Sequence, residues 1–176
     1  MHTPPRLETR RLVLKLPHLG DAPGIARSYA ADPEVARYLS WRPHSRLDET
    51  HAFLRDLLRR ERAGHSHPWL LTSRDGGDVL GMVEARQTPE GWELGYVLAR
   101  AAWNRGLMTE AVGGVLPALS GLGLERIFAD THRDHVASQR VLEKNGFARH
   151  GIVPRNALRP NVSPEPTDSL RYVKGL

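Results

Sequence analysis

The chain has 176 residues, of which 40% are hydrophobic and 26% charged. This balance is typical of one globular domain, here 1–176, and not of a disordered or fibrous protein. The absence of cysteine excludes disulfides, thiolate zinc sites and a cysteine nucleophile. The net charge of +5 is spread over dispersed basic residues, which disfavours nucleic-acid binding as the main function. No membrane span or secretory signal is recognisable, so we expect a cytoplasmic location and no membrane partner.

The first part of the chain is predicted to form one strand followed by helices. Charged and apolar residues alternate over Arg11–Leu16, as is typical of a strand. Helices are expected over Leu19–Ala31 and Glu34–Leu39. Ser45 and Asp48 resemble a capping box, which predicts that a long amphipathic helix begins there.

The rest of the chain is predicted to contain three strands joined by turns and then alternating helices and strands. In chain order we expect strands Pro68–Ser73, Val79–Arg86 and Trp92–Ala99, helix Met108–Leu119, strand Glu125–His132, helix Asp134–Asn145, strand Phe147–Val153, a loop over Arg155–Thr167 and strand Leu170–Lys174. The order β-α-α-β-β-β-α-β-α-β-β predicts a mixed α/β (α+β) fold with an antiparallel region and a later β-α-β unit.

A glycine-containing loop lies where the helix Met108–Leu119 is expected to begin. The first turn of a helix presents N–H groups without intrahelical acceptors, and it forms the positive end of the helix dipole. Such a terminus can bind phosphate through the backbone. Gly106 would let the backbone approach the ligand, and Arg105 adds positive charge. The segment is therefore a candidate phosphate site, although a glycine before a helix is also common in a plain turn.

Gly95 lies inside the strand Trp92–Ala99. An isolated glycine in a strand predicts a bulge or a close backbone approach. A bulge would splay this strand from Glu125–His132, and the exposed backbone groups could pair with an extended, amide-containing ligand. Ser138, early in the next helix, could bind the same ligand or be a self-satisfied helix residue. Asp134 is the expected cap of that helix.

These segments together resemble the GNAT superfamily of N-acetyltransferases. Trp103–Ala111 (W-N-R-G-L-M-T-E-A) is similar to the family's pyrophosphate-binding motif, and His135–Phe147 (H-V-A-S-Q-R-V-L-E-K-N-G-F) is similar to its next motif. Trp92–Leu98 resembles the strand beside the splay. The opening Leu7–Leu14 and the loop around Trp41 resemble the RimJ/RimL branch, the ribosomal-protein N-terminal acetyltransferases. The resemblance implies a GNAT-like fold, with a mixed central sheet, splayed strands and helices on both faces.

The resemblance also implies how acetyl-CoA, the cosubstrate, binds. The residues implied in cofactor binding are Val97, Leu98, Asn104, Arg105, Gly106, Leu107, Met108, Thr109, His135 and Ser138. Val97 and Leu98 would pair with the amides of the pantetheine arm. His135 stands where this branch usually has an Asn that bonds the arm. Leu142 replaces the Tyr acid of many members, which leaves Ser138 as the candidate donor to the departing sulfur.

Two carboxylates are candidates for the base that neutralises the acceptor amine. Glu93, on the strand beside the splay, could act through a water molecule. It could also be a plain surface carboxylate of a strand. Glu84, on the preceding strand, is the second candidate.

Several functional alternatives stay open at this point. The expected partners are acetyl-CoA and a primary amine, either a protein N-terminus or a small molecule, and a homodimer is an open option. A non-catalytic acyl-CoA-binding regulator and an RNA- or ribosome-associated module are the two rivals. The nine histidines predict no metal site, because His132 and His135 bridge a strand end and a helix start without further ligands.

Overall fold

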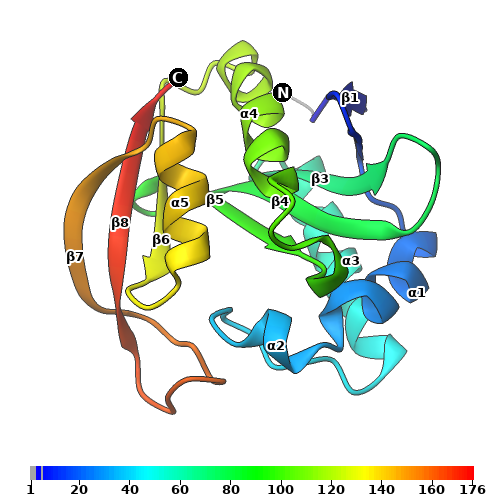
Figure 1. Ribbon diagram of the computed structural model, residues 1–176, viewed down its shortest axis with the longest axis horizontal. Helices are drawn as coiled ribbons and strands as arrows, with labels where there is room; N and C mark the ends of the chain where they lie inside the picture. Colours follow the sequence, from blue (N-terminus) through cyan, green and yellow to red (C-terminus); the bar gives the residue numbers. More distant parts are fainter. Residues whose placement is uncertain (1–2, 5) are drawn as a thin grey trace.

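An eight-stranded mixed sheet forms the centre of the computed structural model, which describes residues 3–4 and 6–176 (Figure 1). The strands are β1 (Arg6–Glu8), β2 (Leu12–Lys15), β3 (Ser66–Ser73), β4 (Val79–Thr88), β5 (Gly91–Leu98), β6 (Arg126–His132), β7 (Ala148–Ala157) and β8 (Thr167–Gly175). They lie in the order β1-β2-β3-β4-β5-β6-β8-β7, and of these neighbours only β5 and β6 run parallel. The predicted mixed α/β fold is confirmed.

The helices cover both faces of this sheet, as expected. They are α1 (Ala22–Ile25), α2 (Pro33–Ala36), α3 (Leu47–Arg62), α4 (Leu107–Gly121) and α5 (Val136–Lys144), with short helical segments at Leu19–Asp21, Ala26–Ala30 and Arg100–Ala102. Successive strand residues point to opposite faces. Leu70 and Met82 accordingly join the cluster beneath α1–α3, whereas Trp69 and Val83 join the cluster beneath α4. No helix in the described ranges is both long and apolar enough to cross a membrane.

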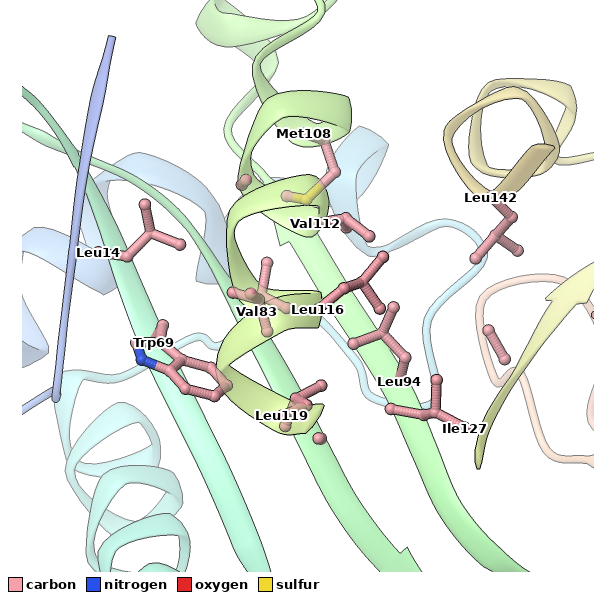
Figure 2. Close-up of a cluster of buried hydrophobic side chains, with 14 of the residues drawn as sticks. Leu14, Trp69, Val83, Leu94, Met108, Val112, Leu116, Leu119, Ile127 and Leu142 are labelled. Atoms are coloured by element: carbon pink, nitrogen blue, oxygen red, sulfur yellow. The ribbon is translucent and has the colours of Figure 1, made fainter. Parts of the chain in front are cut away.

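Helix α4 is held against the sheet by apolar side chains. Figure 2 shows Val112, Leu116 and Leu119 of α4 among Trp69 and Val83 of the strands. Trp69 is fully buried. This packing fixes α4, and therefore the loop at its N-terminus, relative to the end of β5.

The first helical region is less regular than predicted. Leu19–Ala31 is helical, but it consists of a 3-10 turn, the α-helical turn α1 and a π-helical turn. Pro23 lies in the first turn of α1. Because proline lacks an N–H, one regular helix cannot carry its hydrogen-bond ladder through this position.

The predicted capping box at α3 is wrong. Helix α3 has Arg46 as its N-cap residue, and Ser45 bonds the carboxylate of Glu49 through both its N–H (3.0 Å) and its hydroxyl (2.9 Å). Asp48 pairs instead with the Arg46 guanidinium at 3.1 Å. The acidic partner of Ser45 is therefore one residue later in the chain than the pattern indicated.

Two more elements differ from the prediction at the edges of the sheet. Strand β1 was not expected, and β7 continues to Ala157, into the segment predicted as a loop. The register between β7 and β8 shifts between Val153 and Ala157, and Arg155 has a φ of 47°. Its N–H donates to Asp168 Oδ1 at 2.9 Å. This irregular pairing extends the hairpin despite the proline-rich composition of the connection.

Candidate functional site

The candidate site begins where β5 and β6 separate. The two parallel strands are in register at Glu93 and Phe128 alone among the described residues. The predicted splay is thus present, but the predicted bulge at Gly95 is wrong, because the β4–β5 register runs without a shift from Gly81–Leu98 to Thr88–Gly91. The gap comes from the short β5–β6 ladder and not from a bulge.

Gly95 has a different role from the one predicted. A Cβ atom at this position would lie 2.9 Å from Nη1 of Arg86, closer than nonbonded atoms normally approach. The missing side chain therefore leaves room for the Arg86 guanidinium beside β5.

A cavity of about 780 Å³ occupies the gap and extends beneath α1–α3. This volume lies within the range of ligand pockets. Among the residues that line it, the predicted site residues are Glu84, Glu93, Val97, His135 and Ser138. The structure therefore brings both candidate bases and part of the predicted cofactor site to one cavity.

Glu93 is a mostly buried carboxylate in this cavity. Arg86 Nε donates to its Oε2 at 3.0 Å, and Arg86 Nη2 forms an ion pair with its Oε1 at 3.0 Å. Burial raises the pKa of Glu93, and the nearby Arg86 charge opposes that effect without cancelling it. A carboxylate with a raised pKa accepts a proton more readily than an ordinary glutamate, which suits a general base.

Glu84 is less exposed than Glu93 and is bonded by side chains from two neighbouring elements. It is 9% exposed, and its Oε1 accepts from Arg60 Nη1 and from the Ser66 hydroxyl, both at 2.7 Å. These bonds place Glu84 in a structural ion pair between α3, β3 and β4.

Ser138 meets Tyr96 across the gap. The hydroxyl groups of the two side chains lie 2.8 Å apart, and Tyr96 Oη donates to the Ser138 carbonyl at 3.1 Å. Burial raises the pKa of Tyr96, so the phenol stays protonated at neutral pH. The sequence reading did not single out Tyr96. The alternation of side chains along β5 was the signal that could have identified it, because this alternation places Tyr96 and Glu93 on opposite faces of the strand.

His135 stands at the start of α5 and is uncharged. It is the N-cap residue of this helix in place of the predicted Asp134, and its side chain makes no capping bond. Its ring stacks on Tyr38 with 4.7 Å between centroids, and Tyr38 also stacks on His132 at 5.1 Å. Burial lowers the pKa of His135 to about 4. A neutral imidazole still has one N–H to donate, as the predicted contact with the pantetheine arm requires.

No group of three or more His, Cys, Asp or Glu in the described part of the chain could hold a metal ion. His132 and His135 line the cavity without a third such residue close enough to complete a site.

The predicted phosphate loop enters α4 with the backbone geometry that needs glycine. Gly106 is the N-cap residue, with a φ of 70°, and Asn104 has a φ of 58°. Leu107 and Met108 are buried, so they can offer a ligand only backbone N–H groups, whereas Arg105 is exposed.

Glu110, which the sequence reading did not single out, fixes this loop to the start of the sheet. Its carboxylate accepts from the Thr9 hydroxyl at 2.6 Å, from the Arg11 N–H at 2.7 Å and from Arg11 Nε at 2.6 Å. Arg11 Nη1 in turn donates to the carbonyl of Arg105 at 2.9 Å. Thr9 and Arg11, which lie about a hundred positions earlier in the chain, therefore hold this loop in place.

The remaining predicted cofactor residues lie beyond the cavity. Asn104–Thr109 and Leu98 are absent from its lining. The Leu98 carbonyl accepts from Trp103 Nε1 at 2.8 Å. Leu98 thus connects the loop to the end of β5, while Val97 is the member of the predicted pair that lines the cavity.

Residues 11–148 match the family model described as the acetyltransferase (GNAT) domain. The chain is 28% identical over 174 residues to the uncharacterized N-acetyltransferase YoaA of Bacillus subtilis (strain 168), an alignment that covers 97% of either chain. It is also 26% identical over 153 residues to the uncharacterized N-acetyltransferase p20 of Bacillus licheniformis, with 84% of either chain covered.

Solved structures share the fold over nearly the whole chain. Mycobacterium smegmatis RimJ in complex with CoA-disulfide superposes with a TM-score of 0.86 at 20% identity, covering 99% of this chain and 90% of that one. RimL, the ribosomal L7/L12 alpha-N-protein acetyltransferase, in complex with coenzyme A gives 0.86 at 16% identity, with 97% and 98% covered. At these identities the likeness concerns the fold.

Proposed function

The chain belongs to the GNAT family of acetyl-CoA-dependent N-acetyltransferases, and from that premise we propose that it transfers acetyl directly to a primary amine in a ternary complex. The observation that carries this proposal is one gap with a mostly buried carboxylate, Glu93, on one face of β5 and a hydroxyl pair, Tyr96 and Ser138, on the other. The chain has no cysteine, so no acetyl-cysteine intermediate can form. The acceptor is a protein N-terminus or a small amine.

Acetyl-CoA enters this arrangement from the α4 end. Its phosphates bind the backbone and positive charge of Asn104–Thr109, and its pantetheine arm follows Val97 and Leu98 toward the cavity. The support is the αL geometry of Gly106 at the N-terminus of a 15-residue helix and the order of these segments along β5. His135 donates its one N–H to an amide of the arm.

Glu93 acts as general base through a water molecule. The amine nitrogen attacks the thioester carbonyl, its proton passes to Glu93, and the carbon–sulfur bond breaks. Glu93 is favoured because it lies at the β5–β6 pair where the gap begins and because burial raises its pKa. Glu84 keeps the supporting role that its bonds to Arg60 and Ser66 indicate.

Ser138 donates a hydrogen bond to the departing thiolate, and Tyr96 positions Ser138. The single phenol proton of Tyr96 can go to the Ser138 carbonyl or to Ser138 Oγ, and in the second arrangement the serine proton is free to point at the sulfur. The 2.8 Å separation of the two hydroxyl oxygens is short enough for that bond.

Ser138→Ala should lower kcat by about 10- to 100-fold, the usual worth of a hydrogen bond to a charged group. The KM for acetyl-CoA should change little, because the bond strengthens mainly in the transition state. Tyr96→Phe should give a smaller loss, and adding it to Ser138→Ala should have no further effect. Both losses should shrink with an acyl donor whose thiol is more acidic. A loss that does not depend on the leaving group would contradict these roles.

His135→Ala should instead raise the KM for acetyl-CoA, by no more than about tenfold, because one neutral hydrogen bond contributes ~0.5–1.5 kcal/mol. His135→Asn should be neutral or favourable. Steady-state kinetics of the two variants separate binding from turnover. A fall in kcat with an unchanged KM would mean that the imidazole takes part in proton transfer.

Direct transfer is tested by initial rates at varied acetyl-CoA and amine, together with the mass of the protein after incubation with acetyl-CoA alone. We expect intersecting reciprocal plots and an unmodified protein. Parallel plots with an acetylated protein would establish a covalent intermediate and overturn the proposal.

A further inference from the structure

We propose that Arg159 forms an anion-binding subsite in the acceptor part of the cavity, and that the acceptor amine therefore also carries a carboxylate. This inference rests on the proposed function and specifies its substrate class. It starts from an arginine that no sequence pattern singled out.

Arg159 is a buried cation whose partners are neutral. It lines the cavity but is only 4% exposed. Its Nη1 donates to Thr167 Oγ1 at 2.6 Å and to the Asp168 carbonyl at 3.4 Å, and its Nη2 donates to Ser169 Oγ at 2.6 Å. These bonds fix the plane of the guanidinium but do not balance its charge.

The other arginines of the cavity all have carboxylate partners. Arg60 pairs with Glu84 at 2.7 Å, Arg86 with Glu93 at 3.0 Å, and Arg171 with Asp130 at 2.7 Å. No carboxylate of residues 3–4 and 6–176 makes such an ion pair with Arg159. A buried charge without a counter-ion is costly, so an arginine kept in this state is a candidate for binding an anion from outside.

The guanidinium also has free donors. Arginine carries five N–H groups, and three of those of Arg159 are used by Thr167, Asp168 and Ser169. The Nε–H and one Nη2–H have no acceptor in the described part of the chain. A planar pair of N–H donors matches the two oxygens of a carboxylate. Burial lowers the pKa of Arg159, and the charges of Asp130 and Glu93 oppose this effect without cancelling it.

The position of Arg159 relative to Glu93 defines the kind of acceptor. Both residues line the same cavity, and the charges of Asp130 and Glu93, neither of them in an ion pair with Arg159, act on its guanidinium. An amine directed to Glu93 would have room for an acidic group at Arg159. His135, on the same lining, is neutral near pH 7 and does not compete for the anion. A free amino acid and a peptide with an acidic residue near its N-terminus both present this chemistry.

The experiment compares acceptors that differ only in one charge. One arm uses a dipeptide amide with Glu or Gln in second place, and the other uses an amino acid and its carboxamide. We expect kcat/KM to be about 10- to 100-fold higher for the acidic member of at least one pair. The arm that shows the difference identifies the source of the carboxylate.

Variants then assign the difference to Arg159. Arg159→Gln should abolish the preference, and Arg159→Lys should restore part of it. Arg155→Gln is the matched control, because the Arg155 side chain is exposed in the same hairpin and its guanidinium forms an ion pair with exposed Glu165. It should keep the wild-type preference. If Arg159→Gln does not fold, the comparison of acidic and neutral acceptors with the wild-type protein still tests whether the subsite exists.

Equal rates for acidic and neutral acceptors would overturn the subsite and leave the proposed function standing. If no amine is acetylated, the proposed function fails, and equilibrium binding of the same acceptor pairs to the wild-type protein with CoA tests the subsite separately. Equal affinity for the acidic and neutral members would then overturn it.

Discussion

Glu93→Gln should lower kcat by about 10²- to 10⁴-fold, the usual contribution of a general base. The affinity for acetyl-CoA should stay within a factor of a few, because Glu93 lines the cavity whereas the predicted phosphate-binding residues Asn104–Thr109 lie outside its lining. Glutamine preserves the shape of the side chain and can still bond Arg86. The measurement is kcat by CoA release, together with the Kd for acetyl-CoA.

The pH profile of the same variant gives a second readout. The base must be unprotonated to act, so kcat/KM of the wild type falls as the pH falls through the pKa of Glu93. Burial raises this pKa, so kcat/KM should fall at a higher pH than it would with an ordinary glutamate as the base. This decrease should be absent in Glu93→Gln.

Glu84→Gln is the matched control for that result. This variant should have a lower melting temperature, because it removes the negative charge of a buried carboxylate that is bonded by Arg60 and Ser66. It should retain most of the turnover. Near wild-type rates for Glu93→Gln at every pH, with a large loss for Glu84→Gln, would exchange the two roles.

Gly106→Val should weaken CoA binding by about tenfold or more, since a non-glycine residue at positive φ costs on the order of 1–3 kcal/mol. The glycine has a φ of 70° at the first turn of α4, where a β-branched side chain forces the backbone to move. The N–H groups would then no longer converge on a phosphate. The Kd for CoA by calorimetry measures the effect.

Gly64→Val provides the control for backbone strain. Gly64 has a φ of 75° in a turn after α3, with open space around it, and it does not line the cavity. It should lose comparable stability and bind CoA normally. An unchanged CoA affinity in Gly106→Val would place the phosphate site elsewhere.

Local patterns predicted the fold well because they depend on neighbours in the chain. The alternation over Arg11–Leu16 and the turn residues that bound the next strands predicted the positions of β2–β5 to within a few residues. The loop at Gly106 was also readable, since its glycine immediately precedes the helix. The prediction at Ser45 was wrong because two acidic residues, Asp48 and Glu49, compete for adjacent roles, and spacing alone does not choose between them.

Long-range contacts in the site could not be predicted in the same way. Ser138 was recognised, but Tyr96, 42 positions earlier, meets it only across the β5–β6 gap. Gly95 was interpreted as a bulge or a close backbone approach, whereas its missing side chain makes room for the Arg86 side chain of the neighbouring strand. Arg159 lies in a connection that resembled a surface loop, and its burial depends on hydroxyl groups of β8.

Acetyl transfer itself is tested most directly by incubating the wild-type protein with acetyl-CoA and a panel of primary amines, while free thiol and acetylated amine are measured together. We expect amine-dependent release of CoA, matched mole for mole by N-acetylated product, and its loss in Glu93→Gln. Tight binding of acetyl-CoA without product from any amine, in a folded protein, would contradict this expectation and indicate a non-catalytic acyl-CoA-binding regulator.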